Sequence, residues 1–381
     1  MKRKIINGII LGALALAPGM MAAPSADASG ITVYKDGDKY VELGGRIQVQ
    51  YHLEDEDGGD TTDSLAFRRL RPYIEGSIHR DWMGKFEWDM GEASEDNEIA
   101  IKDAYMAYKG LEGITIKFGN AYAPFSREAL TSSKKQQLVE RTFVGDHNYG
   151  SPDRSLGVHA DGSLLDKNVT WAASVTSASI DPDNKKLDFD TPVNRNDDFN
   201  EGWMLSGRVD YHPFGYLDFS QGDFNRDTLK ATVGVAAFTW NNDGDNNGFA
   251  NSVEKVNGYE LSGAVRYMGA SVDAQYNIFD AEAVNTALTA GIFKNGSTQL
   301  TNYSVEGGYM VIPSKLEVVA GYSGQDADNY AKQWTRTELG ANWFFQKHDI
   351  KLQGTYRMGK NVDGVDGADT DEVFIQAQYV F

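Results

Sequence analysis

Apolar and polar residues alternate along most of this chain from residue 39 onward. In the first such stretch, Val41 and Leu43 alternate with Glu42. Successive side chains of a β-strand point to opposite faces, so a period of two predicts strands with one apolar and one polar face. The same alternation recurs at 69–78, 85–90, 114–118, 203–211, 259–267, 272–278 and 350–358.

The alternating segments are the right length and number for a membrane barrel. Each approaches the roughly 9 to 11 residues that a tilted strand needs to cross a bilayer, and about sixteen of them fit between 39 and 381. The frame is ambiguous near Asp103, because Ile101 suggests one parity and Ala104 and Met106 the other. A β-bulge there would account for the change of frame.

The connections between these segments fall into two alternating classes. Short turns on one side and long loops on the other are typical of a transmembrane β-barrel. One link, 213–228, is long but falls on the short-turn side, which predicts either an unusual turn or a misplaced strand. The short links are 80–82, 109–112, 268–270, 312–314 and 346–348. The long links are 54–64, 122–154, 181–200, 241–256, 283–298 and 359–370.

These patterns predict an all-β fold, a transmembrane antiparallel β-barrel of about sixteen strands. A soluble β-sandwich or propeller is the alternative. A propeller would show a repeat of roughly 40 to 50 residues, and the sequence contains none.

The first residues have the features of a secretory signal peptide. Lys2, Arg3 and Lys4 precede an apolar run over 5–17, and Ala26-x-Ala28 supplies a small-residue cleavage site. We therefore predict a signal peptide over 1–28 and a barrel domain over 29–381. The apolar run is too short for a transmembrane helix.

The last segment, 372–381, is an amphipathic strand that ends on an aromatic residue. Val373, Tyr379 and Phe381 fall on one face, and Gln376 and Gln378 fall on the other. This ending resembles the C-terminal assembly signal of bacterial outer-membrane barrels, in which Tyr379 and Phe381 would be read by the barrel assembly machinery. The resemblance predicts localisation in the bacterial outer membrane.

Composition narrows the classes of function. The 381 residues include no cysteine, which excludes disulfides and thiolate metal sites. The formal net charge of -19 disfavours nucleic acid as a partner. The six histidines form no metal-spaced pair, and the acidic run around Asp243 and Asp245 lacks the EF-hand pattern. We predict no metal, no cofactor and no enzyme activity; an outer-membrane hydrolase and an adhesin or scaffold barrel are the alternatives.

A barrel of about sixteen strands encloses an aqueous channel, so the default function is passage of solutes. The longest loop, 122–154, is the candidate for the constriction. Segment 118–133 reads FGNAYAPFSREALTSS, and 138–141 reads LVER. With IKDAY at 101–105 and RRLR at 68–71, this sequence resembles the phosphate-selective porin O and P family, which has a similar strand, Pro-Phe, Leu-Thr-Ser-Ser and Glu-Arg series at its third loop.

The resemblance implies a sixteen-stranded trimeric porin whose third loop folds inward to constrict the channel, and whose loop and wall cations bind phosphate or polyphosphate. The matching loop cations are Arg127, Lys134, Lys135 and Arg141. The cations that face inward on the predicted parity are Arg46, Arg69, Arg71, Lys85, Lys117, Arg208, Arg266, Arg336, Lys351 and Arg357. In the alternative interpretation, Glu128 and Glu140 pair with Arg127 and Arg141 and hold the loop against the wall.

The predicted wall carries both signs of charge, because carboxylates such as Glu87, Asp210 and Glu260 share the inward face with these cations. Opposed charges orient dipolar solutes but do not by themselves exclude cations. We therefore expect passive diffusion of small anions or small polar solutes, with a general or cation-preferring porin as the alternative. The expected partners are outer-membrane lipids, lipopolysaccharide and two further copies of the chain in a homotrimer.

Overall fold

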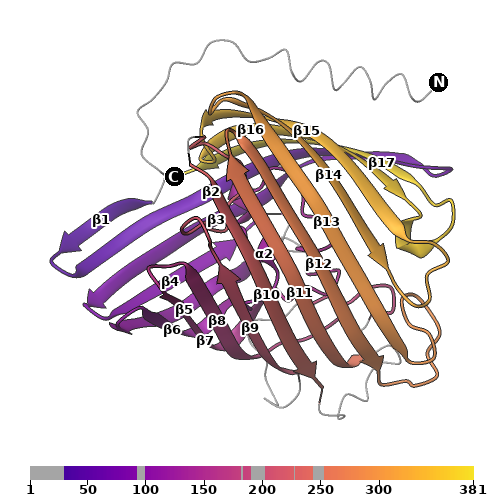
Figure 1. Ribbon diagram of the computed structural model, residues 1–381, viewed down its shortest axis with the longest axis horizontal. Helices are drawn as coiled ribbons and strands as arrows, with labels where there is room; N and C mark the ends of the chain where they lie inside the picture. Colours follow the sequence, from indigo (N-terminus) through magenta and orange to yellow (C-terminus); the bar gives the residue numbers. More distant parts are fainter. Residues whose placement is uncertain (1–29, 92–98, 182, 190–201, 227, 243–252) are drawn as a thin grey trace.

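The computed structural model describes residues 30–91, 99–181, 183–189, 202–226, 228–242 and 253–381. Seventeen strands form one antiparallel sheet that curls into a barrel (Figure 1). The first nine strands are β1 (Ile31–Asp36), β2 (Lys39–Glu56), β3 (Thr61–His79), β4 (Trp82–Asp89), β5 (Ala100–Leu111), β6 (Ile114–Tyr122), β7 (Arg154–Leu164), β8 (Val169–Ser177) and β9 (Trp203–Tyr211). The remaining strands are β10 (Lys230–Asn241), β11 (Val253–Tyr267), β12 (Ala270–Ala283), β13 (Ser297–Ile312), β14 (Leu316–Asp326), β15 (Trp334–Gln346), β16 (Ile350–Lys360) and β17 (Thr370–Val380).

Pairing between the last strand and the second closes the barrel. Strand β17 runs antiparallel to β2 from Thr370 opposite Glu56 to Val380 opposite Arg46. Two backbone hydrogen bonds between Gly45 and Phe381, of 2.8 and 3.0 Å, complete the seam. The sixteen strands from β2 to β17 therefore form a closed ring, which confirms the predicted antiparallel barrel.

Strand β1 lies outside this ring and was not predicted. It pairs with the start of β2, from Ile31 opposite Leu43 to Asp36 opposite Lys39. That stretch of β2 lies beyond Gly45, where the pairing with β17 ends. Strand β1 thus occupies the side of β2 that β17 leaves free.

The alternation read from the sequence matches the two faces of the wall. In β11, Tyr259, Leu261 and Val265 are 45 to 55% exposed on the outer face. Their neighbours Glu260 and Arg266 are 5% and 3% exposed on the inner face. An apolar exterior and a polar interior suit a barrel that lipid surrounds.

Two bulges change the local parity. The pairing of β4 with β5 shifts between Phe86 and Trp88, which resolves the ambiguous frame near Asp103. The pairing of β2 with β3 shifts between Gln48 and Val49, so that Arg68 is the extra residue that the register passes over. A strict alternation would turn Arg68 outward, but the bulge turns it toward the lumen beside Arg69.

Short and long connections alternate as predicted, with two exceptions. Residues 57–60 form a short turn, because β2 and β3 remain paired as far as Asp55 opposite Thr61; the predicted long loop over 54–64 is wrong. The link between β9 and β10, residues 212–229, is long although it lies at the short-turn end. Among the described residues, no helix is both long enough and apolar enough to cross a membrane.

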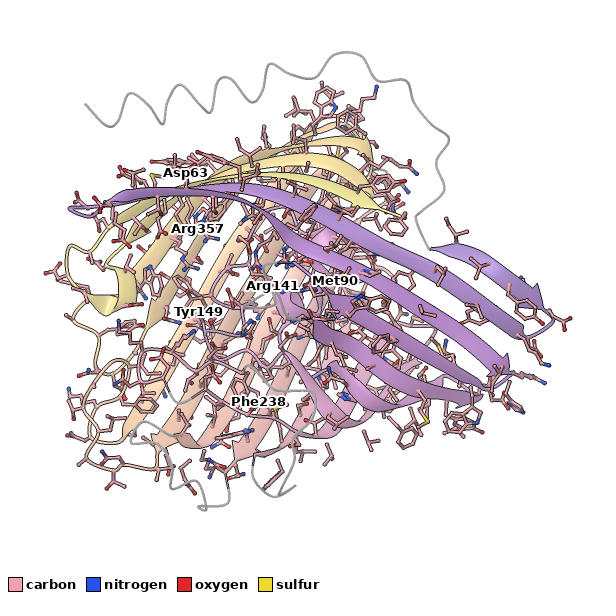
Figure 2. The ribbon with its side chains drawn as sticks, turned by 180° about the vertical axis from the view of Figure 1, so that it is seen from behind. Asp63, Met90, Arg141, Tyr149, Phe238 and Arg357 are labelled. Carbon is pink, nitrogen blue, oxygen red and sulfur yellow. The ribbon has the colours of Figure 1, made fainter. Side chains whose placement is uncertain are left out.

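An apolar core lies inside the barrel toward the long loops. Phe125 comes from the β6–β7 connection, Leu187 from the β8–β9 connection, and Phe293 from the β12–β13 connection. All three pack in one cluster with the inward side chains of Phe238 and Phe279 on the wall. Figure 2 labels Phe238 in this cluster, which holds the long connections against the wall.

Because the outer face of the barrel is apolar, a charged side chain introduced there should destabilise the protein. Val235 is 54% exposed near the middle of β10 and pairs with Val209 and Leu261 on the same face. Val235→Arg places a cation in the hydrocarbon and is expected to lower the free energy of unfolding by roughly 2–4 kcal/mol. Reversible urea unfolding in lipid vesicles measures this loss. Val235→Leu is the control, and equal stability of the two variants would contradict a lipid-facing position.

Candidate functional site

The β6–β7 connection, residues 123–153, folds into the barrel; it is called the inner loop below. It contains α2 (Arg127–Leu130) and the 3-10 turn η2 (Ser133–Lys135). The Ser126 hydroxyl caps α2 by accepting from the Ala129 amide at 3.1 Å. Figure 2 shows Arg141 and Tyr149 of this loop within the outline of the barrel. The predicted inward-folded third loop is therefore present.

The inner loop is bound along one side of the lumen, from β11 to β17. The Arg127 amide donates to Glu260, and the Gln137 side chain donates to Glu317 at 2.6 Å. Further along, the Val139 amide donates to the Thr355 hydroxyl at 3.2 Å. These wall groups are buried, so each needs a partner inside the protein. The loop thus fills the β11–β17 side and leaves open space on the β2–β8 side.

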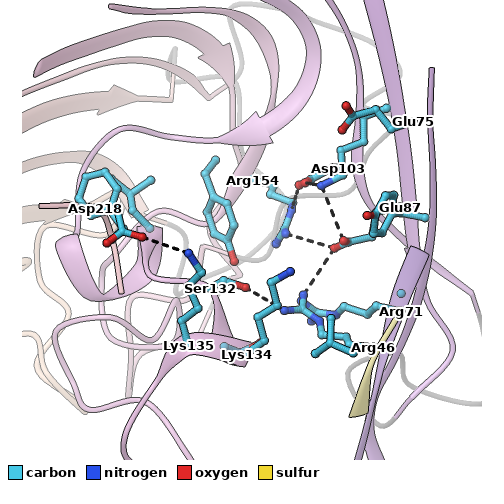
Figure 3. A pocket seen from close by; sticks show the side chains of 18 residues that line it. Arg46, Arg71, Glu75, Glu87, Asp103, Ser132, Lys134, Lys135, Arg154 and Asp218 are labelled. Atoms are coloured by element: carbon cyan, nitrogen blue, oxygen red, sulfur yellow. Dashed lines mark hydrogen bonds and ion pairs between the residues drawn. The ribbon is translucent and has the colours of Figure 1, made fainter. Parts of the chain in front are cut away.

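That space includes a cavity of about 470 Å³, called the turn-side chamber below (Figure 3). Its walls are the loop residues 132–135, the inward faces of β2 to β5, and Asp218 and Phe219 from the β9–β10 link. The cations that line it are Arg46, Arg71, Lys85, Lys134, Lys135 and Arg154. The carboxylates that line it are Glu75, Glu87, Asp103 and Asp218.

Most of the chamber charges are paired. Asp103 accepts from Arg154 at 2.5 Å and from Lys85 at 2.7 Å. Glu87 lies 3.6 Å from both Arg46 and Arg154, too far for a short charge-assisted hydrogen bond. Glu87 is therefore shared loosely between two guanidinium groups.

Lys134 differs from the other chamber cations. Among the described residues, no carboxylate lies within ion-pair distance of its ammonium group, although its backbone carbonyl accepts from Gln378 at 3.0 Å. Burial lowers the pKa of Lys134, and the positive charges of Arg46 and Lys135 lower it further. An anion in the chamber would relieve this repulsion.

A second cavity of about 370 Å³ lies at the loop end and is called the loop-side cavity below. Glu140 separates it from the chamber by holding the inner loop to β3: Arg68 donates to Glu140 at 2.7 and 3.2 Å. Arg336 stands over the Phe143 ring at 4.0 Å and donates to the Tyr149 hydroxyl at 3.0 Å. The arginines that line the cavity are Arg68, Arg141, Arg336 and Arg357.

Comparison with known proteins identifies the family. The model of the family "Phosphate-selective porin O and P" matches residues 41–381, which is most of the chain. The chain belongs to this family. A curated relative, Porin O of Pseudomonas aeruginosa, is 30% identical over 189 residues, which cover 45% of this chain and 42% of that protein. The chain therefore aligns with less than half of that relative's length.

Solved structures of other porins share the fold. An anion-selective porin from Comamonas acidovorans has a TM-score of 0.62 at 12% identity, over 90% of this chain and 100% of that one. The trimer form of OmpT from Vibrio cholerae has a TM-score of 0.53 at 15% identity, over 90% of this chain and 99% of that one. The family match places the porin in the bacterial outer membrane. In outer-membrane barrels the short turns face the periplasm, and we orient this barrel by that rule.

The four predicted loop cations of this porin separate into two groups. Lys134 and Lys135 face the turn-side chamber. Arg127 is 3% exposed between the inner loop and the wall, where it pairs with Asp273 of β12 at 3.2 Å. Arg141 lines the loop-side cavity and donates to the backbone carbonyls of Ala129 and Thr131. Only the two lysines therefore meet solute space in the chamber.

The expected pairs Arg127–Glu128 and Arg141–Glu140 are not the ones that form. Glu128 accepts from both the amide and the hydroxyl of Thr142. Glu140 instead accepts from Arg68 and lies near Arg69. Arg127 and Glu128 are adjacent on the α2 turn and point in different directions, so each side chain finds a partner further along the chain. The loop is held to the wall as that interpretation proposed, but by other residues.

Most of the predicted wall cations of the porin have a carboxylate within ion-pair distance, and six of them show how the wall is paired. Arg46 and Arg71 line the turn-side chamber, whereas Lys117 and Arg208 line a neighbouring cavity of about 530 Å³. Arg69 and Arg266 are buried at 4% and 3% exposure. The pairs are Arg46–Glu87, Arg69–Glu140, Arg71–Asp89, Lys117–Asp161, Arg208–Asp210 and Arg266–Asp273. The mixed wall is thus arranged as ion pairs.

Three site residues were not predicted. Arg68 was missed because its inward direction depends on a bulge. Arg154 lies at the first position of β7, where its guanidinium stands over the Tyr122 ring at 4.0 Å. Asp218 lies in the 212–229 link, and the unusual length of that link was the only signal for it.

Metal binding has no support among the described residues, where no group of three or more potential ligands is clustered. The acidic run at Asp243 and Asp245 lies outside the described residues.

The inner loop is joined to the β8–β9 connection by a titratable pair. His147 lies 2.7 Å from Asp188, which Lys186 also contacts at 2.8 Å. Burial lowers the pKa of His147, but the hydrogen bond with Asp188 and the charge of Asp146 outweigh it and raise the pKa to about 9. Protonated His147 stabilises the contact with Asp188. This stabilisation is complete below about pH 6.5, the usual pKa of histidine, and is lost as the pH rises through about 9.

We expect the backbone of residues 183–189 to lose protection from hydrogen exchange between pH 8 and pH 10, after correction for intrinsic rates, because His147 loses its charge there. His147→Gln should show the lower protection already at pH 7. His79→Gln, at an exposed turn, is the control. Equal wild-type protection across this pH range would contradict the role of the His147–Asp188 pair.

Proposed function

We propose that this porin lets small anions of the phosphate type diffuse passively across the outer membrane, and that the turn-side chamber selects them. The observation that carries the proposal is Lys134, which lacks a carboxylate partner among the described residues and lies in a lining of six cations and four carboxylates. One of the six, Arg71, is neutralised by Asp89 just outside the lining, which leaves the chamber with a small excess of positive charge. A narrow, partly buried site with excess positive charge attracts anions and repels cations.

The chamber offers donors suited to a phosphate group. Arg46 is held at 3.0 Å by the Ser132 hydroxyl and only loosely by Glu87, so its guanidinium can face a passing anion. Together with Lys134 it would replace part of the hydration shell of the anion. Because each contact is individually weak, the anion can also leave, as conduction requires.

A general or cation-preferring porin is the second candidate. The ion pairs along the wall support it, since most of the predicted wall cations have a carboxylate partner and contribute little net charge. The chain also carries a formal net charge of -19. The reversal potential in a planar bilayer under a salt gradient decides between the two, because its sign reports which ion is preferred.

We further propose that the protein has no enzyme activity and is a homotrimer in contact with outer-membrane lipids and lipopolysaccharide. The trimer form of the Vibrio cholerae neighbour supports the oligomeric state. Removal of 1–28 as a signal peptide, and recognition of Tyr379 and Phe381 by the barrel assembly machinery, complete the proposal. The mass of the detergent complex tests the trimer, and a closed channel in the bilayer would favour a scaffold or hydrolase.

The double change Lys134→Glu with Lys135→Glu is expected to lower the anion-to-cation permeability ratio by roughly twofold or more, because it reverses the two loop cations of the chamber. Reversal potentials measure the ratio. Lys315→Glu, in an exposed short turn on the same side of the membrane, makes a charge reversal outside the chamber and serves as the control. An unchanged ratio in the double variant would remove both lysines from the selecting site.

A further inference from the structure

The 212–229 link enters the barrel from the periplasmic end and meets the inner loop; its residues 212–226 are called the inward turn below. Asp218 and Phe219 of this turn line the turn-side chamber opposite β2 to β5. The turn therefore forms part of the periplasmic exit of the chamber, beside Lys134 and Lys135 of the inner loop (Figure 3).

The inward turn is anchored mainly by groups other than the Asp218 carboxylate. The Gln221 amide donates to the Lys135 carbonyl at 3.1 Å, and the Gln137 amide donates back to the Gln221 side chain at 2.7 Å. Arg266 donates to the Ser220 carbonyl at 2.7 Å, and the Phe224 ring packs edge-on against Phe344. Removing the charge of Asp218 leaves all these contacts in place.

The Asp218 carboxylate instead faces the solute space. It accepts from the Ser220 hydroxyl at 2.7 Å and from the Lys135 ammonium at 3.1 Å. The side chains of Lys135 and Asp218 are 37% and 45% exposed, so water reaches the pair. Solvent-exposed ion pairs are weak, on the order of 0–1 kcal/mol, and therefore exchange partners readily.

Asp218 is ionised at neutral pH. Burial raises its pKa, but the hydrogen bond from Ser220 and the charge of Lys135 outweigh this and lower the pKa below its usual value. The carboxylate therefore competes with any anion for Lys135 under physiological conditions.

We propose that Asp218 determines selectivity and release: it competes with the passing anion for the Lys135 ammonium group and so returns the anion to water at the periplasmic exit. This inference rests on the proposed anion passage through the chamber. Lys134 binds the anion, because it has no carboxylate partner in the described part of the chain. Lys135 binds the anion only when its ion pair with Asp218 is broken. A channel needs sites that bind strongly enough to attract an ion and weakly enough to release it.

The test compares Asp218→Asn with Asp161→Asn in planar bilayers. Asp161 is a matched control, because it pairs with Lys117 at 2.7 Å with 43% of its side chain exposed but lies outside the chamber. Two quantities are measured for each channel: the reversal potential in a potassium chloride gradient, and the concentration of inorganic phosphate that halves the chloride current.

Asp218→Asn leaves six cations against three carboxylates in the chamber, from the six against four of the native lining. We expect the anion-to-cation permeability ratio to rise roughly twofold and the half-blocking phosphate concentration to fall about threefold or more, because bound phosphate is released more slowly. Asp161→Asn should change both quantities much less. Equal effects of the two variants would overturn the inference.

Lys135→Gln separates competition from a general charge effect. Alone it should raise the half-blocking phosphate concentration, and in its background Asp218→Asn should have little further effect on phosphate block, because the two groups act through one contact. Full additivity would assign Asp218 a diffuse electrostatic role and overturn the proposed competition. If Asp218→Asn does not fold, as judged by heat-modifiable migration on gels, the carboxylate is a structural anchor and the inference fails.

The ion selectivity and phosphate block of the wild-type channel distinguish a failure of this inference from a failure of the proposed function. A cation-preferring wild type without phosphate block would overturn the proposed anion passage. An anion-preferring wild type in which Asp218→Asn changes nothing would overturn only the role of Asp218.

Discussion

Backbone pairing between β2 and β17 is the constraint on which the rest of this structure depends. Lipid offers no hydrogen bonds, so a sheet that crosses a membrane must leave no edge, and here the pairing of Val380 with Arg46 and of Phe381 with Gly45 removes the last one. Closure fixes which face of every strand points inward. The inward direction of Arg46 and Gln48 follows from that register, and so does the wall that the inner loop meets.

The interior of the barrel is asymmetric because the inner loop packs mainly against one wall and reaches β2 and β3 through only a few side chains. On the β11–β17 side, buried amides and carboxylates such as Asn342 and Glu317 are satisfied by the loop backbone and by Gln137. Buried polar groups without partners are costly, so this network holds the loop in one position. The space left for solute then lies against β2 to β8, and the inward turn lines its periplasmic end. The fold thereby concentrates Lys134 and Lys135 on one side of a chamber.

Much of this architecture could be predicted from the sequence, because strand parity is a local property with a period of two. The outer row of Tyr259 and Leu261 and the inner position of Arg208 follow directly from it. The bulge that turns Arg68 inward could not be predicted, because it depends on how β2 and β3 pair across the sheet. Ion-pair partners such as Arg127 with Asp273, 146 positions apart, depend on where a loop packs, and no sequence spacing encodes that.

A wall made mostly of ion pairs is compatible with the proposed anion passage, because cations without close carboxylates lie in the turn-side chamber that the solute crosses. A guanidinium held by a carboxylate, as in Arg71–Asp89 at 2.5 Å, contributes mainly a dipole, whereas a cation shared loosely or left without a carboxylate contributes net charge. Such cations gather at the chamber, where Arg46 lies 3.6 Å from Glu87 and Lys134 faces both Arg46 and Lys135. A barrel with a balanced wall can therefore favour anions through one short segment. The ion pairs along the rest of the wall offer the anion few free cations at which it could be trapped.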